Sequence, residues 1–200
     1  MAKQQFDFFA EAPKYPEGFK YQPAIITPDH ERDLIEHIKA LPLREFEFHG
    51  FTGKRRVKSF GWHYDFGEEV LKKTEEIPSW VLPLRDVVAG FAGIQPDEIQ
   101  HVLTTEYDHA GIGWHRDKAT FDDIIGVSLL APCTFRLRRK VAGTWERVSL
   151  EAEPRSVYLM RGPSRTEWEH SIPTVEGVRY SITFRTLRQL ENAKRMQRRF

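Results

Sequence analysis

The sequence predicts a mainly β protein with flanking helices, an α+β chain built as an antiparallel sandwich or jelly roll, and three observations predict it. Short runs in which apolar and polar residues alternate recur from residue 100 onward. Two apolar stripes with helical spacing precede these runs. No repeat, linker or shift in composition divides the 200 residues. Alternation with a period of two is typical of half-buried strands, so we expect one domain over residues 1–200 with two packed sheets.

The N-terminal part of the chain predicts an arm and two helices. Residues 1–24 are aromatic and proline-containing without a clear period, and we expect an extended arm packed on the domain. Thr27-Pro28-Asp29 predicts a helix start, because Thr caps a helix, Pro fits its first turn and an acid favours its positive end. Pro42 ends this helix. Its stripe is Leu34, Ile35, Ile38 and Leu41, and a second helix after Pro83 has Leu84, Val87, Val88 and Phe91 on one face, with Gly93 near its end.

The remainder of the chain predicts strands. In one run Cys133, Phe135 and Leu137 alternate with polar residues, so one face is buried and the other is polar. Val141-Ala142-Gly143 predicts a hairpin turn, and the polar residues 189–200 predict a basic C-terminal helix. The predicted strands are 100–107, 124–130, 133–140, 144–150, 156–160 and 179–187.

Composition and charge limit the possible partners and location. The formal net charge is only +1, so no overall field draws the protein to nucleic acid, and any such binding must use local basic patches. Three patches exist, at 54–58, 136–140 and 194–199, and each is also compatible with a solvated face. One cysteine, no apolar leader at the start of the chain and no apolar stretch near 20 residues predict a cytoplasmic protein that is not in a membrane. Nothing indicates an obligate oligomer, so we expect a monomer.

A motif of three residues predicts a metal site. His115 and Asp117 are two residues apart, so on an extended segment both side chains point to the same side. His170 would complete two histidines and one carboxylate, the facial set that holds non-haem Fe(II) and leaves coordination positions open. The other histidines have no partner at ligand spacing, and the nearest competitor, His109, lies in a predicted loop.

Two arginines predict an anionic co-substrate beside this metal. Arg179 and Arg185 are six residues apart on one predicted strand and therefore face the same way. Each guanidinium can hold a carboxylate with two hydrogen bonds. Two cations that face into a barrel need an anion, because an unpaired buried charge is very costly. The pair therefore favours a dicarboxylate co-substrate.

The chain resembles the AlkB-type Fe(II)/2-oxoglutarate dioxygenases over about residues 50–188. His170 follows Asp117 by 53 residues, Arg179 follows nine residues later and Arg185 six after that. The matching elements are Tyr107, residues 113–118, Val127-Ser128-Leu129, Glu169-His170, residues 179–185 and the segment 54–64. The resemblance implies a double-stranded β-helix with a catalytic core at about 100–188 and a nucleotide-recognition lid at about 50–66. It also implies Fe(II), 2-oxoglutarate and O2 as cofactors, with ascorbate as the reductant in vitro.

The resemblance also implies roles for single residues. Arg179 would bind the distal carboxylate of 2-oxoglutarate with help from the Tyr107 hydroxyl, and Arg185 would bind the carboxylate next to the keto group. His115, Asp117 and His170 would be both the metal ligands and the catalytic residues. Thr105 and Ser181 stand where the family often has Asn, so we expect them to contact 2-oxoglutarate with a shorter reach.

For the substrate, the resemblance implies alkylated bases in single-stranded DNA or RNA, as in alkylation damage repair. A base inside a duplex cannot reach the metal, so it must be flipped out or already single-stranded. Phe60, Trp62 and Tyr64 alternate as candidate stacking residues, and Arg55 and Arg56 are candidate phosphate contacts. The alternative is that the three rings form the core face of an ordinary strand.

Other functions stay open at this point. The family's repair enzymes carry an acid two residues past the metal Asp, where this chain has Ala119, so recognition of adenine-type lesions is not predicted. The same chemistry on modified tRNA or on a protein is one alternative. A zinc hydrolase uses a similar ligand set but has no need for the paired arginines. A non-catalytic binding module would be favoured by a missing ligand, and none is missing.

Overall fold

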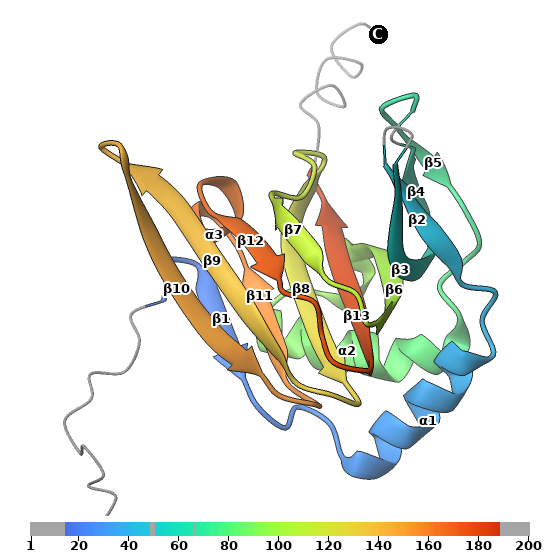
Figure 1. Cartoon of the computed structure of the whole chain (residues 1–200). Coiled ribbons are helices and arrows are strands. Elements are labelled where there is room, and N and C mark those ends of the chain that lie inside the picture. Colours follow the sequence, from blue (N-terminus) through green and yellow to red (C-terminus); the bar gives the residue numbers. More distant parts are fainter. Residues whose placement is uncertain (1–14, 49–50, 66, 189–200) are drawn as a thin grey trace, which may run out of the picture.

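Two antiparallel sheets face each other in the computed structural model, which describes residues 15–48, 51–65 and 67–188 (Figure 1). The larger sheet has the order β1 (Phe19–Gln22), β11 (Val157–Met160), β8 (Phe121–Leu129), β13 (Val178–Leu187), β6 (Ile99–Asp108), β3 (Phe51–Phe60) and β2 (Arg44–Phe48). The smaller sheet has the order β10 (Thr144–Ala152), β9 (Cys133–Val141), β12 (Glu169–Ile172) and β7 (Ile112–His115). This confirms the mainly β jelly roll.

The outer face of the larger sheet is covered by two helices, α1 (Pro28–Lys39) and α2 (Leu82–Ala92). Thr27 caps α1 and accepts a hydrogen bond from the amide of His30, and Gly93 ends α2 in the left-handed region with φ of 69°. The start of α1 and the end of α2 therefore lie where the capping residues predict, whereas α2 begins at Leu82, just before the predicted start after Pro83 and without a side-chain cap. Short helical turns complete the chain: α3 (Pro163–Thr166) and 3-10 turns at Ser79–Val81 and Pro96–Glu98.

Strict alternation divides the larger sheet into two faces. On β13, Ile182 and Phe184 are fully buried against the helices, so Arg179 and Arg185 project from the opposite face, toward the smaller sheet. Strands β6, β8 and β11 alternate in the same way. The inner face is therefore where polar side chains collect, and it is the face that carries the predicted site.

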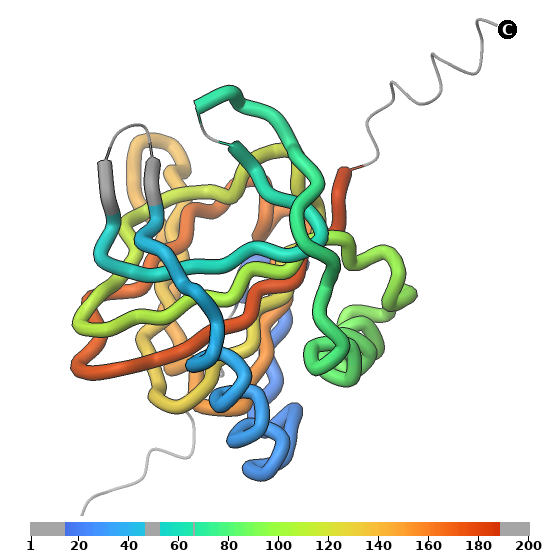
Figure 2. The backbone as a smooth tube through the Cα atoms, turned by 90° about the vertical axis from the view of Figure 1, so that its right-hand side faces the viewer, coloured from blue at the N-terminus to red at the C-terminus, as the bar shows by residue number. Residues whose placement is uncertain are grey.

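Two hairpins rise at one end of the sheets: β2–β3, and β4 (Trp62–Asp65) with β5 (Val70–Lys73) (Figures 1 and 2). The segment predicted as a lid, at about 50–66, forms two strands, β3 and β4, which its sequence did not distinguish. The strands β2, β5, β7 and β12 were also not predicted, because their short sequences are dominated by charged and site residues rather than by alternation. The β9–β10 hairpin is confirmed, with Ala142 and Gly143 at φ of 46° and 87°.

The two ends of the chain lie mostly outside the described residues. Within the predicted arm, residues 19–22 form β1 and pair with β11, so this part is an edge strand of the larger sheet. Residues 1–14 and the predicted basic helix at 189–200 lie outside the described residues. In the part of the chain that the structure describes, no helix has the length and apolar character needed to cross a membrane.

Candidate metal centre and active-site cavity

The three predicted metal ligands meet between the sheets. His115 ends β7 and pairs directly with His170 of β12, which places the two imidazole centroids 4.1 Å apart. Asp117 follows β7, and its Oδ2 lies 3.6 Å from Nε2 of His170. One ligand atom from each residue lies within 4.8 Å of the others. The predicted spacing therefore corresponds to a real cluster of two nitrogen donors and one carboxylate.

Local contacts and burial prepare these groups for a metal. Nδ1 of His115 lies 2.8 Å from the carbonyl oxygen of Gly113, so it can donate there and leave Nε2 for an ion. Burial, reinforced by the charge of His115, lowers the pKa of His170 to about 3, and burial also lowers the pKa of His115. Burial alone would raise the pKa of Asp117, but Arg185 and the two histidines hold it below its usual range. Two neutral imidazoles and one carboxylate are the protonation states that Fe(II) requires.

Arg185 lies directly beside this cluster. Its Nε and Nη2 donate to Oδ1 of Asp117 at 3.0 and 2.7 Å, and Nη1 lies 3.3 Å from Nδ1 of His101. Oδ2 of Asp117 is buried and has no hydrogen-bond partner among the described residues. A buried carboxylate oxygen without a donor is costly. The unsatisfied atom therefore fits a metal ion bound between it and the two imidazoles.

Arg179 projects from the same face of β13 as Arg185, six residues away, but its surroundings differ. It is 1% exposed, and Nη2 donates to the hydroxyl of Ser128 at 2.7 Å. Its Nε and Nη1 have no hydrogen-bond partner among the described residues, and its guanidinium lies 5.0 Å from the centroid of the Tyr107 ring. A buried cation with two free donors requires an anion. The site therefore fits the distal carboxylate of 2-oxoglutarate.

The predicted minor contacts of the co-substrate meet at one point. Thr105 of β6 and Ser181 of β13 are register partners, and both are buried. The two departures from the family pattern therefore lie opposite each other, where two short side chains replace two longer ones. Thr105 and Tyr107 both line the cavity described below.

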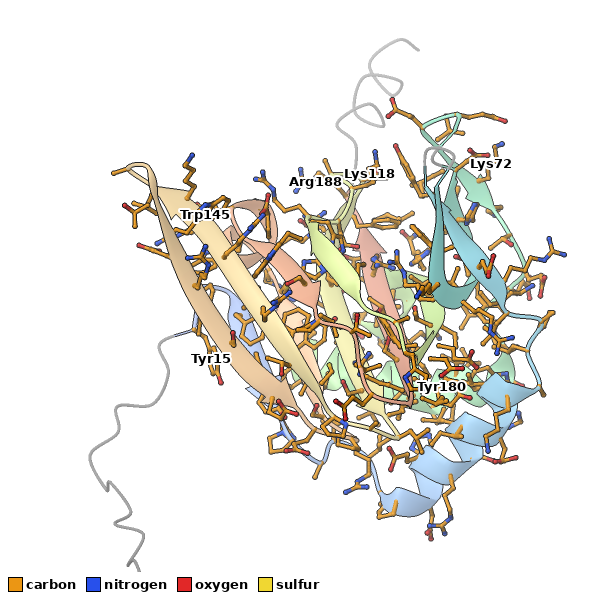
Figure 3. All side chains as sticks on the ribbon, in the orientation of Figure 1. Tyr15, Lys72, Lys118, Trp145, Tyr180 and Arg188 are labelled. Atoms are coloured by element: carbon orange, nitrogen blue, oxygen red, sulfur yellow. The ribbon has the colours of Figure 1, made fainter. Side chains whose placement is uncertain are left out.

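A cavity of about 1300 Å³ runs from the metal cluster to the hairpins. Its inner part is lined by the metal ligands, Arg185, His101 and Tyr107, and its outer part by β3 and β4. Of the predicted substrate contacts, Arg55 and Tyr64 line this cavity. Lys118, which Figure 3 labels, follows Asp117 in the chain. Its ammonium lies 5.2 Å from the centroid of the Tyr64 ring, so it joins the turn at Asp117 to the β4–β5 hairpin.

The structure places three other predicted substrate contacts away from the cavity wall. Phe60 is 3% exposed and packs in the core beneath the helices, which is the alternative that the sequence left open. Arg56 points to the same side of β3, where its Nε donates to Glu106 at 2.7 Å. Trp62 lies against Lys73, whose ammonium is 5.9 Å from the ring centroid. For Phe60 and Arg56 the correction follows from the period of two, since both alternate with the cavity-facing Arg55.

Several residues of the site could not be predicted from sequence. Tyr158 lines the cavity because Gly126 leaves room for it: a Cβ at position 126 would lie 2.2 Å from the Tyr158 ring. His101 is 3% exposed beside Arg185. Arg165 of α3 is 4% exposed and donates from Nη2 to the carbonyl oxygens of Asp117, Lys118 and Phe121 at 3.1, 2.6 and 3.0 Å. It fastens the turn that carries the metal carboxylate, and no motif signals it.

The fold and this donor set define a class of protein, and the comparisons agree. A family model described as the 2OG-Fe(II) oxygenase superfamily matches residues 18–185. The chain belongs to this superfamily, and it is a 2-oxoglutarate-dependent dioxygenase that uses Fe(II), 2-oxoglutarate and O2.

Within the superfamily, the chain is similar to AlkB homologues. An Arabidopsis thaliana protein, "Alkylated DNA repair protein ALKBH8 homolog", is 27% identical over 181 residues, which cover 78% of this chain and 51% of that protein. This chain thus spans about half the length of that relative. The structure of OsALKBH1 matches with a TM-score of 0.63 and 15% identity over 86% of this chain and 99% of that chain, which shows a shared fold.

The chemistry of such a site can be divided between cofactor and chain. When bound, Fe(II) with 2-oxoglutarate and O2 supplies the oxidising power that hydroxylates a C–H bond and releases succinate and CO2. His115, Asp117 and His170 would hold the metal on one face and leave the other face open toward the cavity. Arg179 would orient the co-substrate by its far carboxylate from its own buried position. Arg165 and Arg185 hold Asp117 in place for this arrangement.

Proposed function

We propose that the protein oxidatively removes alkyl groups from bases in single-stranded or flipped-out nucleic acid. Hydroxylation of an N-methyl group gives an N-hydroxymethyl product that loses formaldehyde and leaves the unmodified nitrogen. The observation that carries this proposal is the cavity of about 1300 Å³ that opens from the metal cluster to the β3 and β4 strands. A space of this kind accommodates a base turned out of its stack.

The walls of the cavity favour a nucleotide over a peptide. Tyr64 lines it and offers aromatic surface to a base. Trp114 alternates with His115 along β7, so its ring lies on the outer face of the smaller sheet. There the guanidinium of Arg138 lies 4.3 Å from the Trp114 ring centroid and 4.2 Å from that of Trp145. Arg136 adds a second cation 4.9 Å from the Trp114 ring. Cations beside aromatic rings on this outer face suit contacts with a nucleic-acid strand whose base enters the cavity.

The family match displaces the two alternative classes that the sequence left open, the zinc hydrolase and the binding module. The name of the Arabidopsis relative refers to alkylated DNA repair, and this supports a nucleic-acid substrate for the present chain. The same chemistry on modified tRNA or on a protein is the second candidate, favoured by the absence of an acid at Ala119. We propose in addition that the protein is a monomer and that it is located in the cytoplasm.

The test is succinate release from 2-oxoglutarate with Fe(II) and ascorbate, with and without methylated oligonucleotides. Single-stranded DNA and RNA of the same sequence, each with and without one methylated base, form the four arms. We expect stimulation of turnover by a methylated strand and release of formaldehyde, both abolished in His115→Ala. Turnover that no oligonucleotide stimulates would overturn the proposal and direct the search to modified tRNA or protein.

A further inference from the structure

Arg55 is a cation of the cavity wall that neither the metal nor the co-substrate uses. Arg55 lies on the cavity side of β3 together with Val57 and Ser59. Its guanidinium carbon lies 3.9 Å from the centroid of the Phe46 ring, which holds the side chain across the outer part of the cavity. The side chain is half-buried. Its position is therefore fixed by stacking, between the hairpin β2–β3 and the metal cluster.

The positive charge of Arg55 acts on the metal cluster, and no carboxylate of the described residues forms an ion pair with it. In the described part of the chain, Arg55 forms no ion pair with a carboxylate, whereas its neighbour Arg56 pairs with Glu106 on the other face. Burial lowers the pKa of Arg55, and so does the charge of Arg185, while Tyr107 and Asp117 raise it. Arg55 in turn contributes to the lowered pKa of His115 after burial. These mutual effects place Arg55 within electrostatic reach of the site where the substrate reacts.

Three of the four acids that line the cavity already have partners. Oδ1 of Asp117 accepts from Arg185, and Oδ2 faces the two imidazoles. At the hairpins, Glu75 pairs with Lys58, and Asp65 pairs with Lys72. The remaining lining acid, Glu45, is exposed. None of these carboxylates faces Arg55 closely enough to form an ion pair with it.

The unpaired charge of Arg55 acts on whatever enters the outer part of the cavity. A base that carries a positive charge would therefore approach Arg55 against repulsion. Arg55 also offers only hydrogen-bond donors, so it matches a base edge that presents carbonyl oxygens.

We propose that Arg55 makes the cavity selective for uncharged or anionic bases that present carbonyl acceptors, against bases that alkylation has made cationic. The inference rests on the proposed function and names the class of substrate within it. Methylation at N3 of cytosine or at N1 of adenine gives a cation, whereas methylation at N3 of uracil leaves the base neutral with two carbonyl groups. Arg55 is thus the residue that discriminates between neutral and cationic bases.

The experiment compares two single-stranded oligonucleotides that differ only in one base, N3-methyluracil or N3-methylcytosine. Turnover is measured as kcat/KM for formaldehyde release, and binding is measured separately with Mn(II) in place of Fe(II). We expect the wild type to favour methyluracil by about tenfold in both, the scale of one poorly screened charge several ångströms away. Arg55→Gln should bring the two substrates close together, Arg55→Glu should reverse the order, and Arg55→Lys should keep it.

Arg56→Gln is the matched control, because Arg56 is the next residue of the same strand and faces away from the cavity. It should leave the ratio of the two substrates unchanged, and thermal melting of each variant shows that it is folded. A wild-type preference for methylcytosine would overturn the inference. So would an equal loss on both substrates in Arg55→Gln, which would make Arg55 a phosphate contact. If neither oligonucleotide binds or reacts, the proposed function fails, and the inference that rests on it fails too.

Discussion

Arg179 and Arg185 lie on the same face of β13, six residues apart, yet their surroundings differ. Arg185 donates to Oδ1 of Asp117 at 2.7 Å and also contacts His101. Arg179 has only the hydroxyl of Ser128, at 2.7 Å, and two of its nitrogen atoms lack a partner among the described residues. The positive charge of Arg185 is therefore balanced in the absence of any ligand, whereas that of Arg179 is not.

This difference separates two roles that the motif alone makes look equivalent. A buried cation without an anion costs stability, which is tolerated only where a ligand later supplies the charge. We therefore expect Arg179 to act mainly in binding the co-substrate. Arg185 is bonded to Asp117, a predicted metal ligand, so we expect it also to stabilise the protein and to orient Asp117 before any carboxylate of the co-substrate approaches it.

The largest expected effect comes from removing the unbalanced cation. Arg179→Met should weaken 2-oxoglutarate binding by about a hundredfold or more, the scale of a lost buried charge pair. The melting temperature of the ligand-free protein should stay unchanged or rise, because the uncompensated charge is gone. Calorimetric titration with 2-oxoglutarate and Mn(II), together with thermal melting, measures both. Arg188→Gln, an exposed site just after β13, is the control, and an affinity within threefold of wild type in Arg179→Met would contradict the assignment.

Removing the balanced cation, Arg185, should lower the stability of the ligand-free protein instead. Arg185→Met leaves Asp117 buried without its donor and should lower the free energy of unfolding of the metal-free protein by about 3 kcal/mol. A divalent metal should restore part of this loss, because a cation again faces the carboxylate. Urea unfolding with and without Mn(II) checks this, and an Arg185→Met protein as stable as the wild type would remove the contrast between the two arginines.

Acid should affect the metal end alone. The pKa of His170 in the folded protein is about 3, below its ordinary value of 6.5. Its contribution to stability is therefore complete above pH 6.5 and is lost as the pH falls toward 3, by on the order of 1 kcal/mol per pH unit. Melting temperatures of the metal-free protein between pH 7.5 and 4 should show this decline. Arg179→Met should show the same slope. His170→Gln should make the slope shallower without abolishing it, because burial also lowers the pKa of His115 and of His101, and an unchanged slope in His170→Gln would refute the cause.

The smallest effect on the affinity for 2-oxoglutarate is expected at Thr105 of β6 and its partner Ser181 of β13. Thr105→Asn and Ser181→Asn would restore the longer side chains of the family pattern, one on each of two paired strands. Each single change should alter the affinity for 2-oxoglutarate by no more than about threefold, the scale of one neutral hydrogen bond. The double change should crowd the site, because both residues are buried opposite each other. Titration of the four proteins measures the coupling, and additive effects would show that the two side chains act separately.

Spacing along the strands was enough to predict which of these residues come together. The ligand triad meets as expected, and the two arginines share one face of β13, since a period of two fixes which side chains share a face. The same rule, applied to β3, could have separated Arg55 from Arg56 and Phe60, but the strand's register relative to the core was not visible in its charged sequence. Tyr158 and Arg165 were not predictable, because each acts through contacts with residues more than 30 positions away, at Gly126 and at the turn after Asp117.

Arg165 fastens the turn at Asp117 with hydrogen bonds to three backbone carbonyl oxygens and involves no metal. The turn is thereby tied to α3, which precedes the strand of His170 by only a few residues. Small zinc domains unfold when a chelator removes their ion, because the ion is their main long-range link. Here that link is made by the polypeptide itself. The protein should therefore survive chelation folded and reload its metal without refolding.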